Sequence, residues 1–371
     1  MLSVGQSGLY RNTMSSIRVL VADDSALMRQ TLKRIICEEP GMELAGTARD
    51  GEDAVAKARE LRPDVVTMDI NMPKLDGITA LQMILEEKIC PVVMVSSLTQ
   101  RGAMTTFECL ELGAFDFVAK PDGTVSANMG AVAAELIAKL RAAASSGVLQ
   151  RLHKNRARRL ASRERVEAPV QRWIPRGPVA VAIGISTGGP ATLSEVLPLL
   201  PPDLPASVFL VQHMPASFLS AFARRLNENC SLKVVEGRAG MAVEPATCYV
   251  APGGLHLCPY RKPGGEIVLR TPSQPPTLFV PSVGVMMQAV LETYGPRTVG
   301  VLMTGIGDDG ANQMVAIRQA GGATIAESEE TAVVFGMPRE AIERGGAEVV
   351  APHYEVARQI VQAVGKVGGK Q

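Results

Sequence analysis

The chain has 371 residues, with 38 Lys and Arg against 37 Asp and Glu, and 46% of its residues are hydrophobic. This length predicts two domains of ordinary size, and the balanced charge argues against a globally basic nucleic-acid-binding protein. Apolar runs stay below the ~20 residues that a membrane span needs, and residues 1–14 lack the basic segment followed by an apolar stretch that is typical of a signal peptide. We therefore expect a cytoplasmic protein with no nucleic-acid partner and no membrane insertion.

Residues 1–16 are expected to form an N-terminal extension, and residues 17–144 a first domain. In this domain, apolar runs that begin at Ile17, Glu43, Asp64, Pro91 and Phe115 alternate with amphipathic helical stretches. Five strands that alternate with five helices predict an open parallel sheet with helices on both faces. Ligands of such a sheet bind outside the carboxyl ends of the strands, so the residues that end each strand are the candidates for chemistry.

Chemically useful side chains end four of these strands. Asp23 and Asp24 end the first strand, Asp69 the third, Ser96 the fourth and Lys120 the fifth. Three carboxylates at one sheet edge suit Mg²⁺, which prefers oxygen ligands. A phosphoryl group on Asp69 could accept a hydrogen bond from Ser96 and pair with Lys120. We favour this interpretation over acids that merely cap strand ends, because five suitable residues meet at one edge.

Three segments of the first domain resemble the receiver domain of response regulators: VLVADDSALMR (19–29), MDINMPKLDG (68–77) and FVAKP (117–121). The resemblance implies a flavodoxin-like five-stranded fold and phosphorylation of Asp69 by a histidine kinase. It also implies Mg²⁺ held by Asp24 and Asp69 with the help of Asp23, and a switch aromatic at Phe117. A phosphoryl group on Asp69 is expected to draw Ser96 toward it and let the aromatic ring turn inward.

Residues 145–177 break the alternating pattern, and they carry nine Lys and Arg against two Glu. This charge density and the flanking Pro and Gly predict a solvated basic linker. A short basic helix over Leu149–Ala161 is the alternative, and docking to an anionic partner is a less favoured role.

From residue 178 to residue 371 we expect a second, larger, doubly wound α/β domain of the hydrolase type. Its first apolar strand runs into GISTGGP (184–190), which fits the G-x-S-x-G pattern of a strand-to-helix turn that exposes Ser186. Such turns also cradle phosphates, so nucleotide binding is an alternative, although no Gly-Lys-Ser/Thr follows. A hairpin is expected between Cys248 and Arg270. The six cysteines show no C-x-x-C pair and are expected to be buried free thiols.

A serine nucleophile needs a base, and the chain has four histidines. His213 ends an apolar strand, as Ser186 does, and is favoured for that reason. His353 lies where an α/β-hydrolase keeps its base, near the end of the chain. His256 could line a substrate cleft from a loop, whereas His153 lies in the linker and is the least favoured.

Two adjacent aspartates, Asp308 and Asp309, follow the strand over residues 298–304, and their spacing does not choose the acid of a triad. Four segments of this half resemble the chemotaxis protein-glutamate methylesterases of the CheB family: AIGISTGGP (182–190), QHMP (212–215), MTGIGDDG (303–310) and VFGMPREA (334–341). The resemblance makes Ser186 the nucleophile, His213 the general base and Asp309 the acid. It places the oxyanion near Thr187 and Ile306, and Ile306 stands where the family often has Met.

Together the two resemblances cover residues 17–361. They imply a phosphorylation-regulated serine esterase that releases methanol from glutamate methyl esters on chemoreceptor helices and often deamidates receptor glutamines. The esterase reaction would need no cofactor, and the partners would be a chemotaxis-type histidine kinase and methylated chemoreceptors. The order of receiver, linker and hydrolase predicts that the receiver covers the cleft until Asp69 is phosphorylated. The rivals are a small-ester α/β-hydrolase with His353 as base and a non-catalytic, phosphorylation-dependent binding module.

Overall fold

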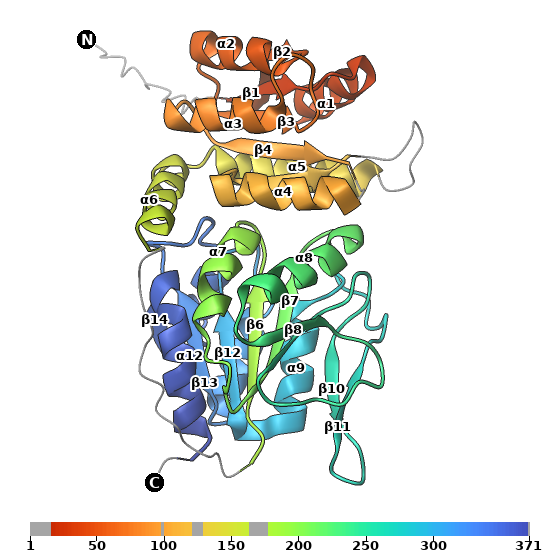
Figure 1. The fold of residues 1–371 in the computed structure, drawn as a ribbon, viewed down its shortest axis with the longest axis vertical. Helices are drawn as coiled ribbons and strands as arrows, with labels where there is room; N and C mark the ends of the chain where they lie inside the picture. Colours follow the sequence, from red (N-terminus) through yellow and green to blue (C-terminus); the bar gives the residue numbers. More distant parts are fainter. Residues whose placement is uncertain (1–15, 98–99, 121–128, 163–176, 370–371) are drawn as a thin grey trace, which may run out of the picture.

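The computed structural model describes residues 16–97, 100–120, 129–162 and 177–369. Two α/β domains are stacked end to end, and a helix, α6, lies beside the junction between them (Figure 1). Each domain is built on its own parallel sheet, as the two alternating patterns of the sequence predict.

The first domain has a five-stranded sheet in the order β2-β1-β3-β4-β5. Its β-branched strands are buried on both faces, and every residue of β3 and β4 is buried, as expected for a parallel sheet covered by helices. The strands are β1 (Ile17–Ala22), β2 (Met42–Ala48), β3 (Val65–Asp69), β4 (Val92–Ser96) and β5 (Asp116–Ala119). The helices are α1 (Ala26–Glu38), α2 (Gly51–Leu61), α3 (Gly77–Glu86), α4 (Gln100–Leu112) and α5 (Met129–Ala143). The predicted flavodoxin-like receiver fold is confirmed.

The second domain has a seven-stranded parallel sheet in the order β14-β13-β12-β6-β7-β9-β8. The strands are β6 (Ala180–Ile185), β7 (Ser207–Gln212), β8 (Lys233–Glu236), β9 (Thr247–Val250), β12 (Thr298–Leu302), β13 (Ala323–Glu327) and β14 (Val349–Ala351). The helices are α7 (Gly189–Val196), α8 (Ala216–Asn229), α9 (Val283–Tyr294), α10 (Ala311–Gln319), α11 (Met337–Glu343) and α12 (His353–Val367), with 3₁₀ turns at Leu197–Leu199 and Gly295–Arg297. The chain enters at β6 and extends the sheet on both sides of it, so β6 lies at the switch point where ligands bind.

The predicted hairpin is wrong in its first half. Only β10 (Cys258–Arg261) and β11 (Ile267–Arg270) form an antiparallel pair, whereas Cys248 lies in β9 and pairs in parallel with β7 and β8. The run TCYV is fully buried, and a fully buried strand belongs in a central sheet rather than in a surface hairpin.

The solvated linker that we favoured is also wrong over the residues that form α6 (Val148–Ser162). Apolar side chains recur four residues apart, at Val148 and Leu152, and both are buried, which is the spacing that fixes one face of a helix against a surface. Asn155 is 3% exposed and its Nδ2 donates 2.9 Å to the carbonyl of Thr331 in the second domain. Residues 163–176, the rest of the basic stretch, lie outside the described residues.

The first domain packs on the second through α4, which faces α7 and α8. Phe218 of α8 meets Phe117 of β5 at a ring-centroid distance of 4.6 Å and Phe107 of α4 at 6.3 Å. At the edge of this contact, the Arg225 guanidinium donates to both carboxylate oxygens of Glu111 at 3.0 and 2.7 Å. The apolar core is therefore continuous from one domain to the other.

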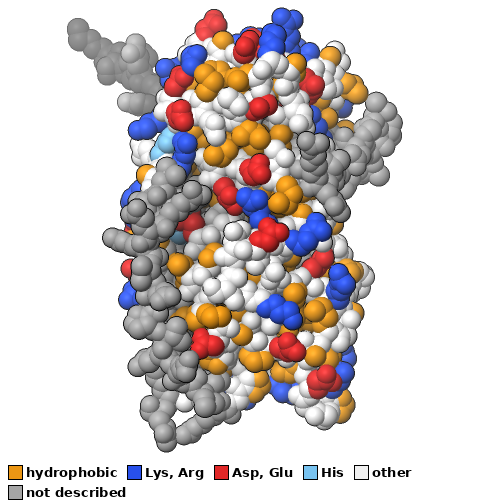
Figure 2. Space-filling model, in the orientation of Figure 1, with side chains coloured by type: hydrophobic (Ala, Val, Ile, Leu, Met, Phe, Trp, Pro, Cys, Tyr) orange, Lys and Arg blue, Asp and Glu red, His pale blue; other side chains and the backbone are white. Residues whose placement is uncertain are grey.

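Acidic and basic side chains are mixed over the face of the molecule shown in Figure 2. This mixture matches the balanced charge of the whole chain, and this face shows no large patch of one sign. Among the described residues, no helix is both long enough and apolar enough to cross a membrane.

The cysteines are free thiols, as expected, although not all of them are buried. Cys90, Cys109 and Cys248 are buried, whereas Cys37 on α1 is exposed. Burial raises the pKa of Cys90 and Cys109 to about 12, so these thiols stay protonated and act as small apolar side chains.

Candidate functional site

Ser186 occupies the sharp turn between β6 and α7. Gly188 has a φ of 78°, which a residue with a side chain rarely adopts, and a Cβ there would lie 2.6 Å from Val333. On the other side, a Cβ on Gly305 would lie 2.7 Å from the Cβ of Ser186. The glycines of the sequence therefore let the turn bend and let a neighbouring loop approach the serine closely.

His213 lies at the neighbouring strand end, because β7 pairs with β6 in a register that sets Gln212 beside Ile185. The backbone amide of His213 donates to the carbonyl of Ile185 at 3.1 Å. Its Nε2 lies 2.9 Å from Oδ2 of Asp309, whereas its buried Nδ1 has no hydrogen-bond partner among the described residues. One ring nitrogen is thus held by an acid and the other is free to exchange a proton.

Asp309 is the acid that the structure brings to His213, and Asp308 is not. Asp309 follows β12 and accepts hydrogen bonds from the backbone amides of Val283 and Gly284 and from the hydroxyl of Ser282, at 2.7 to 2.9 Å. Burial alone would raise the pKa of Asp309, but its hydrogen bonds with His213 and with these amides hold that pKa below the ordinary value of an aspartate. Asp308 turns away and pairs with Arg344.

Sequence reasoning missed Ser282 and the amides that begin α9 as partners of Asp309. They lie more than 20 residues before the acid, and only the fold brings them together. A helix N-terminus favours a negative charge, so α9 keeps Asp309 ionised and fixed in place. The one local signal is Ser282 itself, which caps α9 by accepting a hydrogen bond from Val285.

An aromatic ring also covers the imidazole, and no sequence pattern predicts this contact. Phe279 stacks on His213 with a centroid distance of 4.2 Å and an interplanar angle of 15°. The stack limits rotation of the imidazole and shields one of its faces from water. Next to it, Leu278 is 90% exposed, so the loop that covers His213 also presents an apolar side chain to solvent.

The two predicted oxyanion positions lie on either side of Ser186. Thr187 follows Ser186 directly, and Ile306 follows Gly305, which approaches Ser186. In the described part of the chain, neither of these two amides donates a hydrogen bond within the protein. Unused amides beside a nucleophile are suited to binding a developing oxyanion.

The other histidines have structural surroundings. His256, one of the candidates for lining a cleft, is instead fully buried, with Nε2 at 2.9 Å from the carbonyl of Pro275 and Nδ1 accepting from the amide of Ser282. His353 is buried between Glu195, at 2.9 Å from Nε2, and Glu327, at 3.7 Å from Nδ1. Burial alone would lower the pKa of His353, but the two carboxylates raise it to about 9. A histidine that is already protonated at neutral pH cannot serve as a general base.

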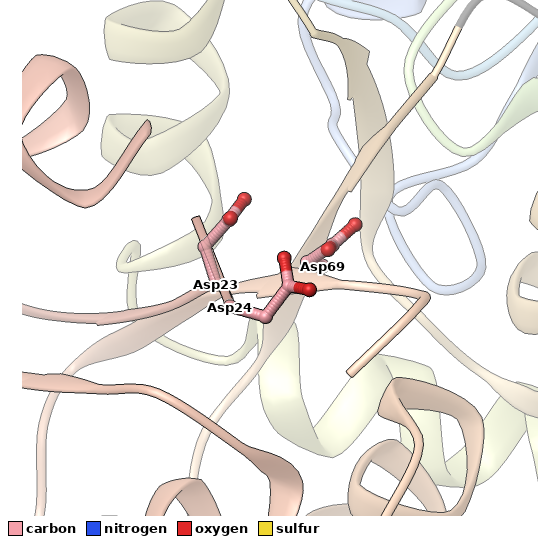
Figure 3. A group of neighbouring side chains, drawn as sticks. All are labelled: Asp23, Asp24 and Asp69. Atoms are coloured by element: carbon pink, nitrogen blue, oxygen red, sulfur yellow. The ribbon is translucent and has the colours of Figure 1, made fainter. Parts of the chain in front are cut away.

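The predicted acidic site of the first domain forms at the carboxyl ends of β1 and β3 (Figure 3). Asp23, Asp24 and Asp69 each offer a carboxylate oxygen within 4.8 Å of the others. The ammonium of Lys120 lies 2.9 Å from both Asp23 and Asp69. Burial raises the pKa of Asp69, and Lys120 opposes this effect without cancelling it. Three converging oxygen donors fit the requirements of Mg²⁺.

The two predicted switch residues, Ser96 and Phe117, make contacts away from Asp69. Ser96 Oγ accepts a hydrogen bond of 2.7 Å from the hydroxyl of Thr106 on α4. Phe117 is 2% exposed and packs against Phe218 of the second domain. Its ring is buried against the second domain in this structure, and the inward turn on phosphorylation stays a prediction.

Comparison with known proteins assigns both halves of the chain. Residues 19–126 match the family model described as "Response regulator receiver domain", and residues 181–360 match "CheB methylesterase". The chain is 58% identical over 360 residues to the protein-glutamate methylesterase/protein-glutamine glutaminase 3 of Syntrophomonas wolfei, covering 94% of this chain and 100% of the relative. It is 51% identical over 354 residues to a relative of the same activity name from Caldanaerobacter subterraneus, covering 94% and 96%.

Among solved structures, the Thermotoga maritima CheB methylesterase catalytic domain is 36% identical with a TM-score of 0.49, covering 50% of this chain and 98% of that one. The response regulator domain of Thermotoga maritima CheB is 53% identical with a TM-score of 0.33, covering 35% and 96%. The identity and coverage of the two full-length relatives decide the assignment. The chain belongs to the CheB methylesterase family, in the form that carries a response-regulator receiver domain at its N-terminal side.

Proposed function

We propose that the chain is a serine esterase that hydrolyses glutamyl methyl esters on chemoreceptors and releases methanol. One observation carries this proposal: His213 is held by Asp309 through Nε2 at 2.9 Å, while its Nδ1, at the strand end next to Ser186, has no hydrogen-bond partner in the described part of the chain. The activity name shared by the relatives supplies the substrate.

In the proposed reaction, Ser186 Oγ attacks the ester carbonyl as His213 Nδ1 takes its proton. The amides of Thr187 and Ile306 would stabilise the oxyanion of the tetrahedral intermediate. His213 then returns the proton to the leaving methanol, which leaves an acyl-enzyme. A water then gives a proton to His213 as its oxygen attacks the acyl carbon. The bond from that carbon to Ser186 Oγ breaks, His213 returns the proton to Oγ, and the glutamate is released. Asp309 keeps the imidazole in place and stabilises its positive charge.

Glutamine deamidation would use the same steps, with ammonia as the leaving group in place of methanol. The shared activity name of the relatives includes this second reaction. Both substrates present a small leaving group on a glutamyl carbonyl, so one nucleophile and one oxyanion site serve them.

Methanol release from methylated receptor, with the purified chain, tests the esterase. Ser186→Ala and His213→Gln are expected to lower kcat by roughly 10⁴-fold or more, because members of a triad act as a unit. His353→Gln should retain most of the turnover. A small-ester hydrolase would instead leave receptor methyl groups intact, and a binding module would function unchanged with Ser186→Ala.

We further propose that Asp69 accepts a phosphoryl group from a histidine kinase. Asp23, Asp24 and Asp69 would hold Mg²⁺, which supplies positive charge for the phosphoryl oxygens when bound. The Lys120 ammonium, already 2.9 Å from Asp69, would pair with the transferred group. The Ser96 hydroxyl would give up its hydrogen bond with Thr106 and donate to the phosphoryl group instead. Because Thr106 lies on α4, the loss of this bond would change the position of the helix that contacts α7 and α8.

This arrangement supports inhibition by the receiver until Asp69 is phosphorylated. The receiver packs on α7 and α8, the helices that follow Ser186 and His213. Asp69→Asn is expected to abolish activation by a small phosphodonor such as acetyl phosphate and to leave the basal rate of methanol release unchanged. Activation that persists in this variant would place the phosphorylated residue elsewhere.

A further inference from the structure

A buried carboxylate lies behind the nucleophile turn and takes no part in the proposed triad. Glu327 ends β13 at the same sheet edge as Ser186, and its side chain is fully buried. A buried acid is costly unless it is hydrogen-bonded and paired. Its partners therefore indicate what it does.

Thr304 connects Glu327 to the nucleophile. Its backbone amide donates to Glu327 Oε2 at 2.9 Å, and its carbonyl accepts the amide of Ser186 at 2.9 Å. Its hydroxyl donates to the carbonyl of Thr187 at 2.8 Å. One residue thus holds Ser186 and Thr187 on one side and is held by Glu327 on the other.

Glu327 is itself fixed by its second oxygen. Thr331 Oγ1 donates to Glu327 Oε1 at 2.9 Å, and His353 Nδ1 lies 3.7 Å from the same oxygen. His353 also pairs with Glu195 of α7, the helix that begins just after Ser186. Each oxygen of the carboxylate thus accepts a hydrogen bond, Oε2 from Thr304 and Oε1 from Thr331.

We propose that Glu327 is a positioning residue for the ester hydrolysis, which acts through Thr304 to aim Ser186 and the Thr187 amide. The proposal rests on the proposed function, since it takes Ser186 as the nucleophile. Glu327 touches neither the substrate nor the reacting atoms. Loss of the hydrogen bond between Glu327 and the Thr304 amide shifts the turn that holds Ser186. A displacement of a reacting group by about 1 Å lowers the rate on the order of 10²-fold.

The test compares Glu327→Ala with Glu327→Gln and with a matched control on the same strand. Glutamine still presents an oxygen to the Thr304 amide, whereas alanine does not. The control is Thr324→Ala, which removes a buried hydroxyl that accepts from the Glu348 amide at 2.9 Å, at the opposite end of β13. For each full-length protein we would measure thermal unfolding and the kcat and KM for methanol release. We would also measure the rate at which a fluorophosphonate labels Ser186.

Glu327→Ala is expected to lower kcat and the labelling rate by roughly 10- to 100-fold with KM nearly unchanged. Glu327→Gln should keep most of both rates, and Thr324→Ala should lose stability alone. A merely structural role would leave the labelling rate of the folded protein unchanged in Glu327→Ala, and that result would overturn the proposal. Equal losses of rate in Thr324→Ala would overturn it as well.

A second pair keeps the test decisive if Glu327→Ala does not fold. Thr331→Val removes the hydroxyl that donates to Glu327 Oε1 at 2.9 Å and keeps the shape of the side chain, whereas Thr331→Ser keeps the hydroxyl. The proposal requires slow labelling in the valine variant and rescue in the serine variant, and equal rates in the two would contradict it. If the fluorophosphonate fails to label Ser186 in the unaltered protein, the proposed function fails, which is a different outcome.

Discussion

The packing of the receiver on the second domain yields a prediction that can be worked out in magnitude. Phe218 of α8 is fully buried and forms ring contacts with Phe117 at 4.6 Å and Phe107 at 6.3 Å, both in the receiver. Phe218→Leu keeps an apolar side chain and removes both aromatic pairs. Each such pair contributes ~0.5–1.5 kcal/mol, so the variant loses about 1–3 kcal/mol of contact between the domains.

This loss applies only while the domains are packed together, because separated domains do not make these ring contacts. The equilibrium should therefore shift toward separation by about 5- to 150-fold. Basal methanol release by the unphosphorylated variant should rise within this range, up to the rate of the phosphorylated protein, and activation by acetyl phosphate should shrink in proportion.

Phe209→Leu is the matched control. Phe209 is equally buried in β7, and its ring contacts Tyr249 at 5.8 Å and Tyr294 at 6.0 Å, both within the second domain. It should lower the melting temperature without raising the basal rate. An unchanged basal rate in Phe218→Leu, or an equal rise in Phe209→Leu, would refute inhibition through this contact.

Three further changes test single groups. Asp309→Asn replaces the acceptor of His213 Nε2 with an amide and should lower kcat by about 10⁴-fold at similar KM, as measured by methanol release; a small loss would remove Asp309 from the triad. Lys120→Met removes the cation beside Asp69, so phosphodonor activation should vanish while basal release remains, and normal activation would contradict that role. The pKa of His353 is raised to about 9 in the folded protein, so the stability it contributes is full below its unfolded pKa of about 6.5 and disappears as pH rises through about 9. Urea unfolding should show that the free energy of unfolding falls less between pH 7 and pH 10 for His353→Gln than for the unaltered protein. Equal falls in the two proteins would contradict a raised pKa of His353.

The residues that could be predicted from the sequence share one property: they end buried strands. Ser186, His213 and Asp69 were found in this way, because parallel strands deliver their carboxyl ends to one edge. The choice of Asp309 over Asp308 could not be made from the residues alone. It depends on which carboxylate faces the amides of α9, and that contact forms only in the folded chain.

The features that sequence reasoning missed depend on contacts between distant segments. Phe279 lies in a Pro-rich loop with no periodic pattern, so nothing in the sequence places it on His213. The basic composition of α6 concealed the apolar spacing of Val148 and Leu152, because high charge density is typical of solvated segments. The apolar face of α6 is buried because Val148 and Leu152 pack into the apolar cluster of the receiver.

The segment from Glu327 to Val334 joins the turn that holds Ser186 to the junction between the domains. At one end, Glu327 holds Thr304, and in the middle the Thr331 carbonyl accepts a hydrogen bond from Asn155 of α6. Val333 packs into the apolar cluster of the receiver and α6, and it also lies against Gly188 in the nucleophile turn. Interiors are packed too densely for one side of such a residue to move alone. A displacement of the receiver that carries α6 with it must therefore break these contacts or move the turn that holds Ser186.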